Sequence, residues 1–205
     1  PIGATIIDHP WDRGIGSFLP SPQRYPDLAE LIEHYHNNGV RVLMWGTCMI
    51  NEDAPNFQEG KDKGYYVGFG QTVKWWNGRG AFIDYTNPEA VEWFHRQMDN
   101  VLEMGIDGWK VDGADPYIML VVPPAGKNDP YITWKEYRSL FYRDFFEYTR
   151  EKLGNDRVIS ARPVDDLPFG VGLPLVFTTK DINFAGWVGD EDNDGGGLRT
   201  ALNDM

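Results

Sequence analysis

The sequence predicts an α/β fold in which parallel strands alternate with helices. Strand-like and helix-like segments follow one another along the 205 residues, and this alternation is typical of a parallel sheet covered by helices. Polar residues stand at or just past the carboxyl ends of the expected strands, which is where a barrel of parallel strands gathers its functional side chains. Together the two observations favour a barrel.

The first expected unit consists of a strand, a helix and a second strand. Residues 4–7 form a β-branched run that predicts a strand, and a polar, turn-rich loop follows it. Asp27 can cap a helix over residues 28–35, where apolar residues recur at i, i+3, i+4 and i+7, and residues 37–39 end it. The apolar run 40–45 is the second strand.

Residues 51–86 form a segment that is too long and too rich in glycine for an ordinary βα connection, which usually takes about 2 to 6 residues. We therefore expect a long insertion with a functional role. Within it, Trp75-Trp76-Asn77-Gly78 is either a platform for a ligand such as a sugar or a plug over the core. Composition leaves both alternatives open.

Two later helices have clear start signals. Asn87 and Pro88 predict the N-cap and first residue of a helix that ends at Gly105. Thr133 and Glu136 have the spacing of a capping box, and a long amphipathic helix follows them as far as Gly154. Two further strands are expected at residues 157–162 and 182–187.

Between these helices, a short apolar-leaning run ends in Asp112 just before Gly113. A buried parallel strand delivers a side chain to its carboxyl end in this way. In a barrel, the period of two points Lys110 and Asp112 inward together, so the ammonium favours the charged form of the carboxylate. An ionised, positioned carboxylate is a candidate nucleophile. The alternative is that Asp112 only caps a turn, with Lys110 as its ion-pair partner.

The ends of the five expected strands carry the informative residues, which are Asp8, Trp45, Asp112, Arg162 and Asp190. A doubly wound sheet would more often show a glycine-rich phosphate loop after its first strand, and none is found there. A complete eight-stranded barrel takes about 250 residues. We therefore predict that residues 1–205 are part of a single catalytic (β/α)8 TIM barrel domain, a partial barrel of about five βα units.

Composition excludes several classes of partner. A net charge of −12 and a pI near 4.7 argue against binding of nucleic acid. No apolar run approaches the roughly 20 residues that span a bilayer, so we expect no membrane contact. The four histidines do not cluster, and the acidic run 190–194 lacks the EF-hand order of ligands, so no metal or other cofactor is expected. Cys48 lies in an apolar run and is expected to be a buried hydrophobe rather than a reactive thiol.

The start of the sequence at Pro1 shows neither a basic leader region nor an initiator Met. We therefore expect a processed or excised portion of a longer chain. The cellular compartment is left open.

Four motifs in order carry a resemblance: Lys61-Asp62-Lys63-Gly64-Tyr65, Trp75-Trp76-Asn77-Gly78, Ala81-Phe82-Ile83-Asp84-Tyr85-Thr86-Asn87-Pro88-Glu89-Ala90 and Gly108-Trp109-Lys110-Val111-Asp112. Through them the chain resembles glycoside hydrolase family 31, the α-glucosidase and α-xylosidase family, from about Ile7 to Leu202. The resemblance implies a retaining hydrolase that removes a terminal sugar from an α-linked glycoside through a covalent glycosyl-aspartate intermediate. It implies an oligosaccharide or glycoside substrate, and it also implies the rest of the barrel and flanking β domains. An isolated segment is therefore expected to be inactive.

The resemblance also implies roles for individual residues. Asp112 would be the nucleophile, and Asp190, in Trp187-Val188-Gly189-Asp190, would be the general acid/base. Asp8 matches an aspartate that binds sugar hydroxyls, and Lys110 matches a lysine of the xylosidase-like branch. The whole substrate-binding set would be Asp8, Trp45, Lys110, Arg162 and Trp187, with Trp11 as a further candidate ring face.

Alternatives remain for several of these roles. Trp45 is equally well explained as core, and Arg162, which Pro163 follows where the family usually has Ser, could pair with Asp165 or Asp166. Asp190 competes with Asp192 and Asp194 for the acid role and ranks first because it directly follows the strand. The chain has Gly113-Ala114-Asp115 where family members commonly have Glu. This departure supports a second hypothesis, a non-catalytic carbohydrate-binding barrel relative.

Overall fold

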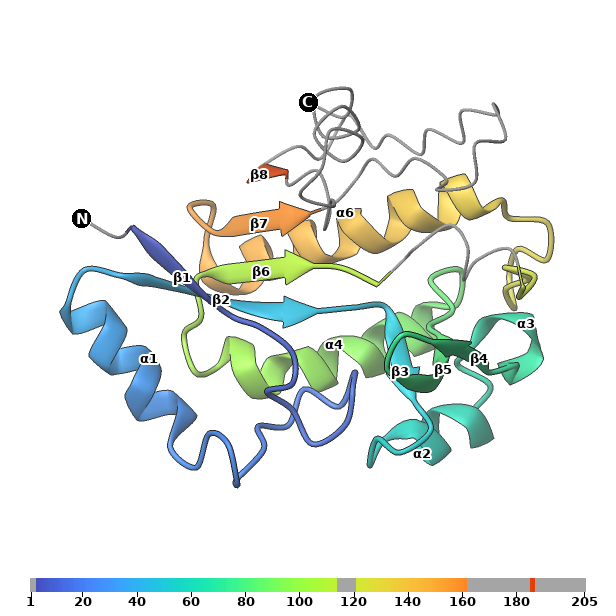
Figure 1. Cartoon of the computed structure of the whole chain (residues 1–205). Helices are drawn as coiled ribbons and strands as arrows, with labels where there is room; N and C mark the ends of the chain where they lie inside the picture. The colour runs from blue at the N-terminus through green and yellow to red at the C-terminus, as the bar shows by residue number, and fades with distance from the viewer. Residues whose placement is uncertain (1–2, 114–120, 162–184, 187–205) are drawn as a thin grey trace, which may run out of the picture.

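The computed structural model describes residues 3–113, 121–161 and 185–186, and the other residues are drawn as a thin grey trace (Figure 1). Five described strands form one sheet in the order β1-β2-β6-β7-β8. They are β1 (Ala4–Ile7), β2 (Arg41–Gly46), β6 (Gly108–Val111), β7 (Val158–Ala161) and β8 (Ala185–Gly186). Every neighbouring pair is parallel. The predicted parallel α/β sheet is confirmed. The carboxyl ends of its described strands all lie at the same edge.

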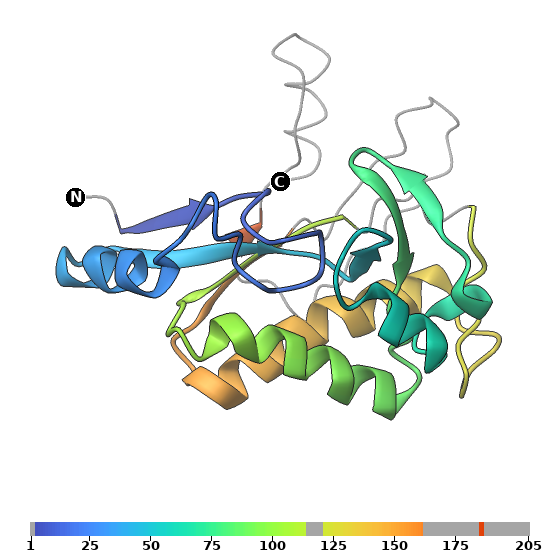
Figure 2. The same ribbon diagram turned by 90° about the horizontal axis from the view of Figure 1, so that it is seen from below.

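The helices that connect these strands are α1 (Leu28–Asn37), α4 (Pro88–Leu102) and α6 (Trp134–Leu153). Figure 2 shows α4 and α6 side by side against one face of the sheet. The predicted caps form, since the Asn87 side chain accepts the Glu89 N–H, and Thr133 and Glu136 make a complete capping box. Asp27 precedes α1 as expected, but its side chain makes no capping hydrogen bond. No helix in the described ranges is long and apolar enough to cross a bilayer.

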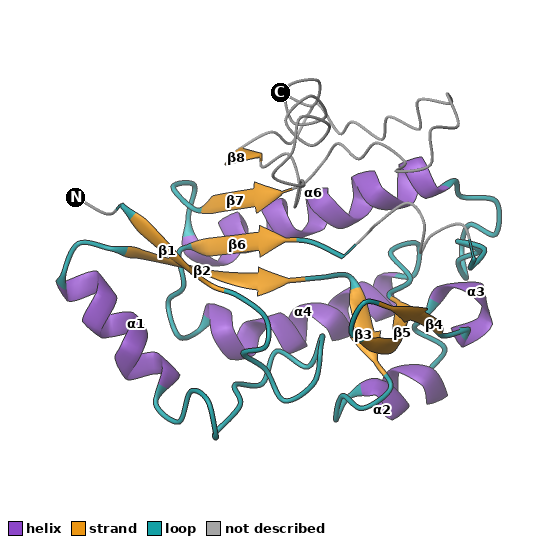
Figure 3. Ribbon diagram, in the orientation of Figure 1, coloured by secondary structure: helices purple, strands orange, loops and turns teal. Residues whose placement is uncertain are grey.

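The insertion between β2 and α4 contains regular structure (Figure 3). Its elements are β3 (Met49–Asn51), α2 (Phe57–Asp62), α3 (Val67–Gly70), β4 (Val73–Trp75) and β5 (Gly78–Phe82). The three strands form an antiparallel sheet in the order β3-β5-β4. Strands of three to five residues interrupted by glycine are too short to show a clear alternation, which is why the sequence indicated only a long connection.

Aromatic side chains fill the space between the parallel sheet and its helices. The Phe18 ring, from the loop after β1, lies 5.3 Å from the Phe94 ring of α4 and 5.6 Å from the Trp109 ring of β6, centroid to centroid, both edge-on. Cys48 belongs to the same core and is fully buried, and burial raises the pKa of its thiol to about 12. The interpretation of Cys48 as a buried hydrophobe is confirmed.

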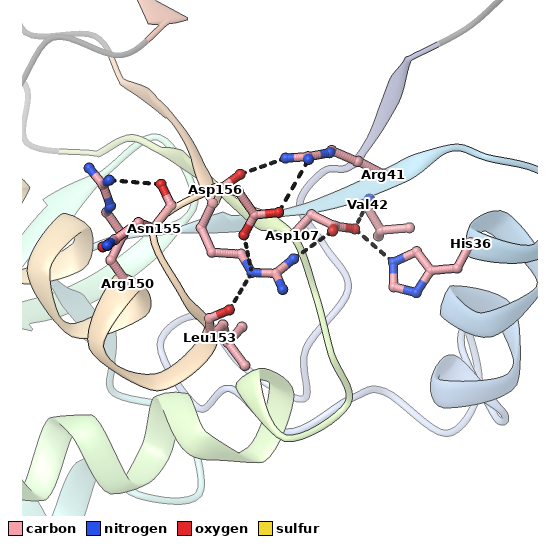
Figure 4. A network of polar contacts seen from close by, with 9 residues as sticks. His36, Arg41, Val42, Asp107, Arg150, Leu153, Asn155 and Asp156 are labelled. Carbon is pink, nitrogen blue, oxygen red and sulfur yellow. Dashed lines mark hydrogen bonds and ion pairs between the residues drawn. The ribbon is translucent and has the colours of Figure 1, made fainter.

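A buried carboxylate ties the strands together at the amino edge of the parallel sheet (Figure 4). Asp107, directly before β6, accepts the backbone N–H of Val42 at 2.8 Å and a guanidinium N–H of Arg157 at 2.8 Å. The Nε2 atom of His36, on α1, lies 2.7 Å from the same carboxylate. One side chain therefore joins β2, β6, the start of β7 and α1.

We predict that Asp107→Ala destabilises the protein by about 2–4 kcal/mol, because it leaves a backbone N–H and a guanidinium without their buried acceptor. The midpoint of urea unfolding of the full-length protein measures this effect. Glu33→Gln, an exposed change on α1, is the control and should leave the midpoint unchanged. Equal midpoints for Asp107→Ala and the wild type would contradict this role.

Candidate active site

The register of the parallel sheet aligns a row of side chains near its carboxyl edge. Trp45, Lys110 and Ser160 are paired across β2, β6 and β7. Asp8 comes directly after β1 and continues the row by one strand. Side chains in one row of a parallel sheet point to the same face, so these residues share the face that would line the inside of a barrel.

An ion pair crosses this row. Lys110 Nζ lies 2.7 Å from Asp8 Oδ2, so the pair spans from β6 to the end of β1 above the intervening β2. The Lys110 side chain is 18% exposed, and that of Asp8 is 51% exposed. Such an accessible pair contributes little to stability, about 0–1 kcal/mol, so its main effect is to fix the positions of both charges. The sequence places the ammonium on the same strand face as Asp112, and the structure adds this ion pair with Asp8.

Asp112 stands directly after β6, at the predicted strand end. Its backbone N–H donates to the Gly46 carbonyl at 2.9 Å, which extends the β2–β6 pairing by one residue. Its Oδ2 atom accepts a hydrogen bond from the indole Nε1–H of Trp45 at 3.3 Å. Trp45 is only 3% exposed, so it is part of the core and also holds the carboxylate. Of the two alternatives weighed for Trp45, the low exposure supports the core residue, and the role of its ring as a face for a sugar stays a prediction.

The chain turns sharply after Asp112. Gly113 has φ +90°, and a Cβ atom placed there would lie 2.5 Å from Thr47 Oγ1 and 3.0 Å from the Trp75 ring. Only glycine fits this conformation and this space. The turn therefore fixes the direction in which Asp112 leaves the strand.

The hairpin of the insertion brings aromatic rings to the edge of this row. The Trp76 ring lies 6.2 Å from that of Trp45 and 5.5 Å from that of Trp75, centroid to centroid. Trp75 is 4% exposed, whereas Trp76 is 55% exposed. The first tryptophan thus plugs the core and the second presents a ring at the rim.

His9 is a residue that the sequence analysis did not place in the site. Its ring lies 5.4 Å from Trp45 and 5.0 Å from Trp76, centroid to centroid, and its Nε2 atom is hydrogen bonded to the Asn77 side chain. Burial lowers the pKa of His9, which favours the neutral imidazole. The sequence could have indicated His9 through its position, because it directly follows Asp8 at the end of an expected strand. His9 joins the loop after β1 to the hairpin of the insertion.

Trp11 corrects one sequence-based candidate. Its side chain is 1% exposed, and its Nε1–H donates to the Trp45 carbonyl at 2.8 Å. Trp11 therefore supports the strand beneath the site and offers no ring face to a ligand.

Asp12, in the same loop, is half-buried against backbone amides. Burial raises the pKa of its carboxyl to about 7, and hydrogen bonds from the backbone of this loop, including Gly16, Ser17 and Phe18, oppose the rise. The Ser17 hydroxyl also donates to Asp12 Oδ2 at 3.5 Å. The proton on Asp12 therefore contributes to the stability of the loop that carries Asp8 and His9.

Three predicted site residues, Arg162, Trp187 and Asp190, lie outside the described residues, as do the alternatives Asp165, Asp166, Asp192 and Asp194. In chain order, β7 ends directly before Arg162, and β8 ends directly before Trp187. Within the described ranges, no group of three or more His, Cys, Asp or Glu side chains is placed to hold a metal ion.

The described site combines three chemical features. A carboxylate with a fixed indole donor lies at the carboxyl edge of the sheet, an ammonium–carboxylate pair lies in the adjacent row, and Trp76 offers an exposed ring. Such a set suits a ligand with many hydroxyls and an apolar face.

The sequence matches the family described as "Glycosyl hydrolases family 31 TIM-barrel domain" over residues 1–204. The chain belongs to glycosyl hydrolase family 31. It is 28% identical to the α-xylosidase XylQ of Lactiplantibacillus pentosus over 165 residues, covering 78% of this chain and 22% of the relative. It is 30% identical to the sulfoquinovosidase of Escherichia coli (strain K12) over 95 residues, covering 44% of this chain and 14% of the relative.

Solved structures have the same fold. A family 31 α-xylosidase from a soil metagenome, complexed with xylose, superposes with a TM-score of 0.78 at 19% identity, covering 98% of this chain and 29% of that one. This chain therefore spans less than a third of the length of the family 31 relatives described here. The predicted TIM-barrel fold is confirmed, with this chain as part of such a barrel.

We predict that Gly113→Ala lowers stability by more than about 1 kcal/mol, because the added Cβ both strains a positive φ and collides with Thr47. Gly105→Ala is the matched control, since Gly105 has φ +81° but nothing within 4 Å of an added Cβ. Thermal unfolding of the full-length variants measures both. A shift for Gly113→Ala no larger than that for Gly105→Ala would contradict the steric argument.

Asp12 predicts a pH dependence. Its folded-state pKa of about 7 lies above the ordinary value of 3.8, so between these values the folded state holds a proton that the unfolded state has lost. Stability from this group is therefore complete at low pH and is lost as the pH rises towards 7. Asp12→Asn should remove this contribution to the decrease in stability between low pH and pH 7. Unfolding midpoints at pH 4.5 and pH 7.5 compare the two proteins, and identical pH dependences would refute the assignment.

Proposed function

We propose that this chain is the catalytic barrel segment of a retaining α-glycosidase, with Asp112 as the nucleophile. The observation that carries the proposal is the position of the Asp112 carboxylate at the edge of the sheet where the carboxyl ends of the five described parallel strands lie. There it accepts a hydrogen bond from Trp45 at 3.3 Å. In a TIM barrel, this edge holds the active site. Membership of family 31 supports the same reading.

In the proposed reaction, an Asp112 oxygen attacks the anomeric carbon as the bond to the leaving oxygen breaks. Asp190 would give its proton to that leaving oxygen. Asp190 would then take a proton from water, whose oxygen attacks the same carbon and releases the Asp112 carboxylate. Two inversions retain the α configuration. The mechanism requires the two carboxyl groups to lie about 5 to 5.5 Å apart.

The other residues would bind and orient the sugar. The Trp45 indole fixes one oxygen of Asp112, so the carboxylate is held before the substrate arrives. The Lys110–Asp8 pair would receive sugar hydroxyls, with Asp8 as acceptor and Lys110 as donor. Arg162 would add charge stabilisation, and Trp187 a ring face.

Relatives of this chain carry the names α-xylosidase, sulfoquinovosidase and, in Bacillus thermoamyloliquefaciens, α-glucosidase 2. We therefore extend the proposed substrate to a terminal α-linked sugar of a glycoside or oligosaccharide and no further. Lys110, which resembles the lysine of the xylosidase-like branch, makes an α-xyloside the first substrate to assay.

A second candidate function is carbohydrate binding without catalysis. The observation that favours it is Gly113-Ala114-Asp115, where family members commonly have Glu after the nucleophile. Such a protein would bind sugars through the same row of side chains but would form no covalent intermediate.

Covalent labelling of the full-length protein distinguishes the two functions. A mechanism-based cyclitol aziridine should add one label, and peptide mass analysis should locate it on Asp112. Asp112→Asn should abolish the label and lower kcat by about ten-thousandfold or more. Trp45→Phe, which removes the indole N–H and keeps a ring, is the graded control with a loss of about tenfold.

A label on any residue other than Asp112 would overturn the nucleophile assignment. Absence of both label and turnover, together with sugar binding that Asp112→Asn leaves unchanged, would favour the non-catalytic alternative.

A further inference from the structure

A cavity of about 520 Å³ has walls that include none of the residues described above for the candidate active site. Two segments far apart in the sequence form most of its walls, residues 61–70 of the insertion and residues 125–130, and Asp84 lies between them. Figure 1 shows α3 and the segment before α6 next to each other, at the end of the molecule beyond the insertion sheet. None of Asp8, Lys110 and Asp112 lines this cavity.

The walls of the cavity are held together by hydrogen bonds. The Gly68 N–H donates to the Ala125 carbonyl at 2.9 Å, and the Lys127 N–H donates to Asp84 Oδ2 at 2.6 Å. Asp84 is 1% exposed, and its other oxygen accepts from the backbone and hydroxyl of Thr86. The cavity is therefore preformed, as ligand sites usually are.

The two most exposed large apolar side chains of the described residues lie in the first segment and directly after the second. Phe69, which lines the cavity, is 99% exposed, and Tyr131, which directly follows the lining residue Pro130, is 90% exposed. Phe69 also has a left-handed backbone, with φ +59°. A bulky residue rarely adopts this conformation, and an outlier that holds an aromatic ring in solvent points to a functional constraint.

We propose that this cavity is a non-catalytic binding site for pyranose units of a neutral, α-linked oligosaccharide. The Phe69 ring at the wall and the neighbouring Tyr131 ring would stack on the apolar faces of the sugar. Lys61 and Lys127 would donate to its hydroxyls, and Lys127, whose Nζ lies 3.0 Å from Glu89 Oε2, has N–H groups left for a second acceptor. The proposal rests on the proposed function, which supplies the oligosaccharide. A mixed apolar and polar hollow suits a sugar better than a protein partner, which would need about 800 Å² of complementary surface.

The test uses the full-length protein with Asp112→Asn, so that the oligosaccharides stay intact, and titration calorimetry with three α-linked glucans, which are maltoheptaose, isomaltoheptaose and nigeroheptaose. We expect at least one of the three to occupy a second site. Phe69→Gly should weaken that site by about tenfold or more, because it removes a stacking ring, and Tyr131→Ala should also weaken it. Glycine adopts φ +59° without strain, so Phe69→Gly should melt no lower than its parent. Leu140→Ala, an exposed apolar change on α6 outside the cavity, should bind like the parent.

Several outcomes would overturn the proposal. They are the absence of a second site for all three oligosaccharides, affinities of Phe69→Gly and Tyr131→Ala within twofold of the parent, and self-association of the parent that Phe69→Gly abolishes. The last would assign the rings to a protein contact.

Activity separates this site from the proposed function. With an intact Asp112, Phe69→Gly should hydrolyse a small aryl α-glycoside within twofold of the wild type. If the wild type hydrolyses no aryl glycoside while oligosaccharide binding still depends on Phe69, the proposed function fails and the cavity site stands.

Discussion

The register of three parallel strands is the constraint on which the site depends. Asp8, Trp45 and Lys110 come from β1, β2 and β6, and the paired ion groups are 102 residues apart in the chain. A slip of one residue in any strand would turn its side chain to the opposite face. At the other edge of the sheet, the Asp107 carboxylate joins β2, β6 and the start of β7. The contacts of Asp107 at the amino edge thus hold the strands in register, and the positions of Asp8, Trp45 and Lys110 near the carboxyl edge depend on that register.

The carboxylate of Asp112 is held from several directions before any ligand arrives. A backbone hydrogen bond continues the strand pairing through it, an indole N–H contacts its side chain, and a glycine turn sets the path of the chain beyond it. Trp45, in turn, is supported by the indole of Trp11 and lies against His9. A layer of aromatic residues therefore connects the hydrophobic core directly to the proposed nucleophile.

Much of the fold could be predicted from the sequence because its signals are local. The caps at Asn87 and Thr133 and the β-branched and apolar strands follow from residue type and spacing alone. The ion pair of Lys110 with Asp8 could not be predicted, because the end of β1 is known to lie within reach of β6 only when the order of β1, β2 and β6 is known. The contacts of His9 with the hairpin, and the burial of Trp75 next to an exposed Trp76, depend on how the insertion folds back on the sheet. No local pattern encodes that contact.

The insertion enters and leaves the barrel at one place. Met49 of its first strand is paired with Phe82 of its last, so the two ends of the module are neighbours in an antiparallel ladder. Residues can therefore be gained or lost inside it without moving β2 or α4. A change confined to the tryptophan hairpin would therefore alter the exposed ring of Trp76 at the rim while the parallel strands keep their register.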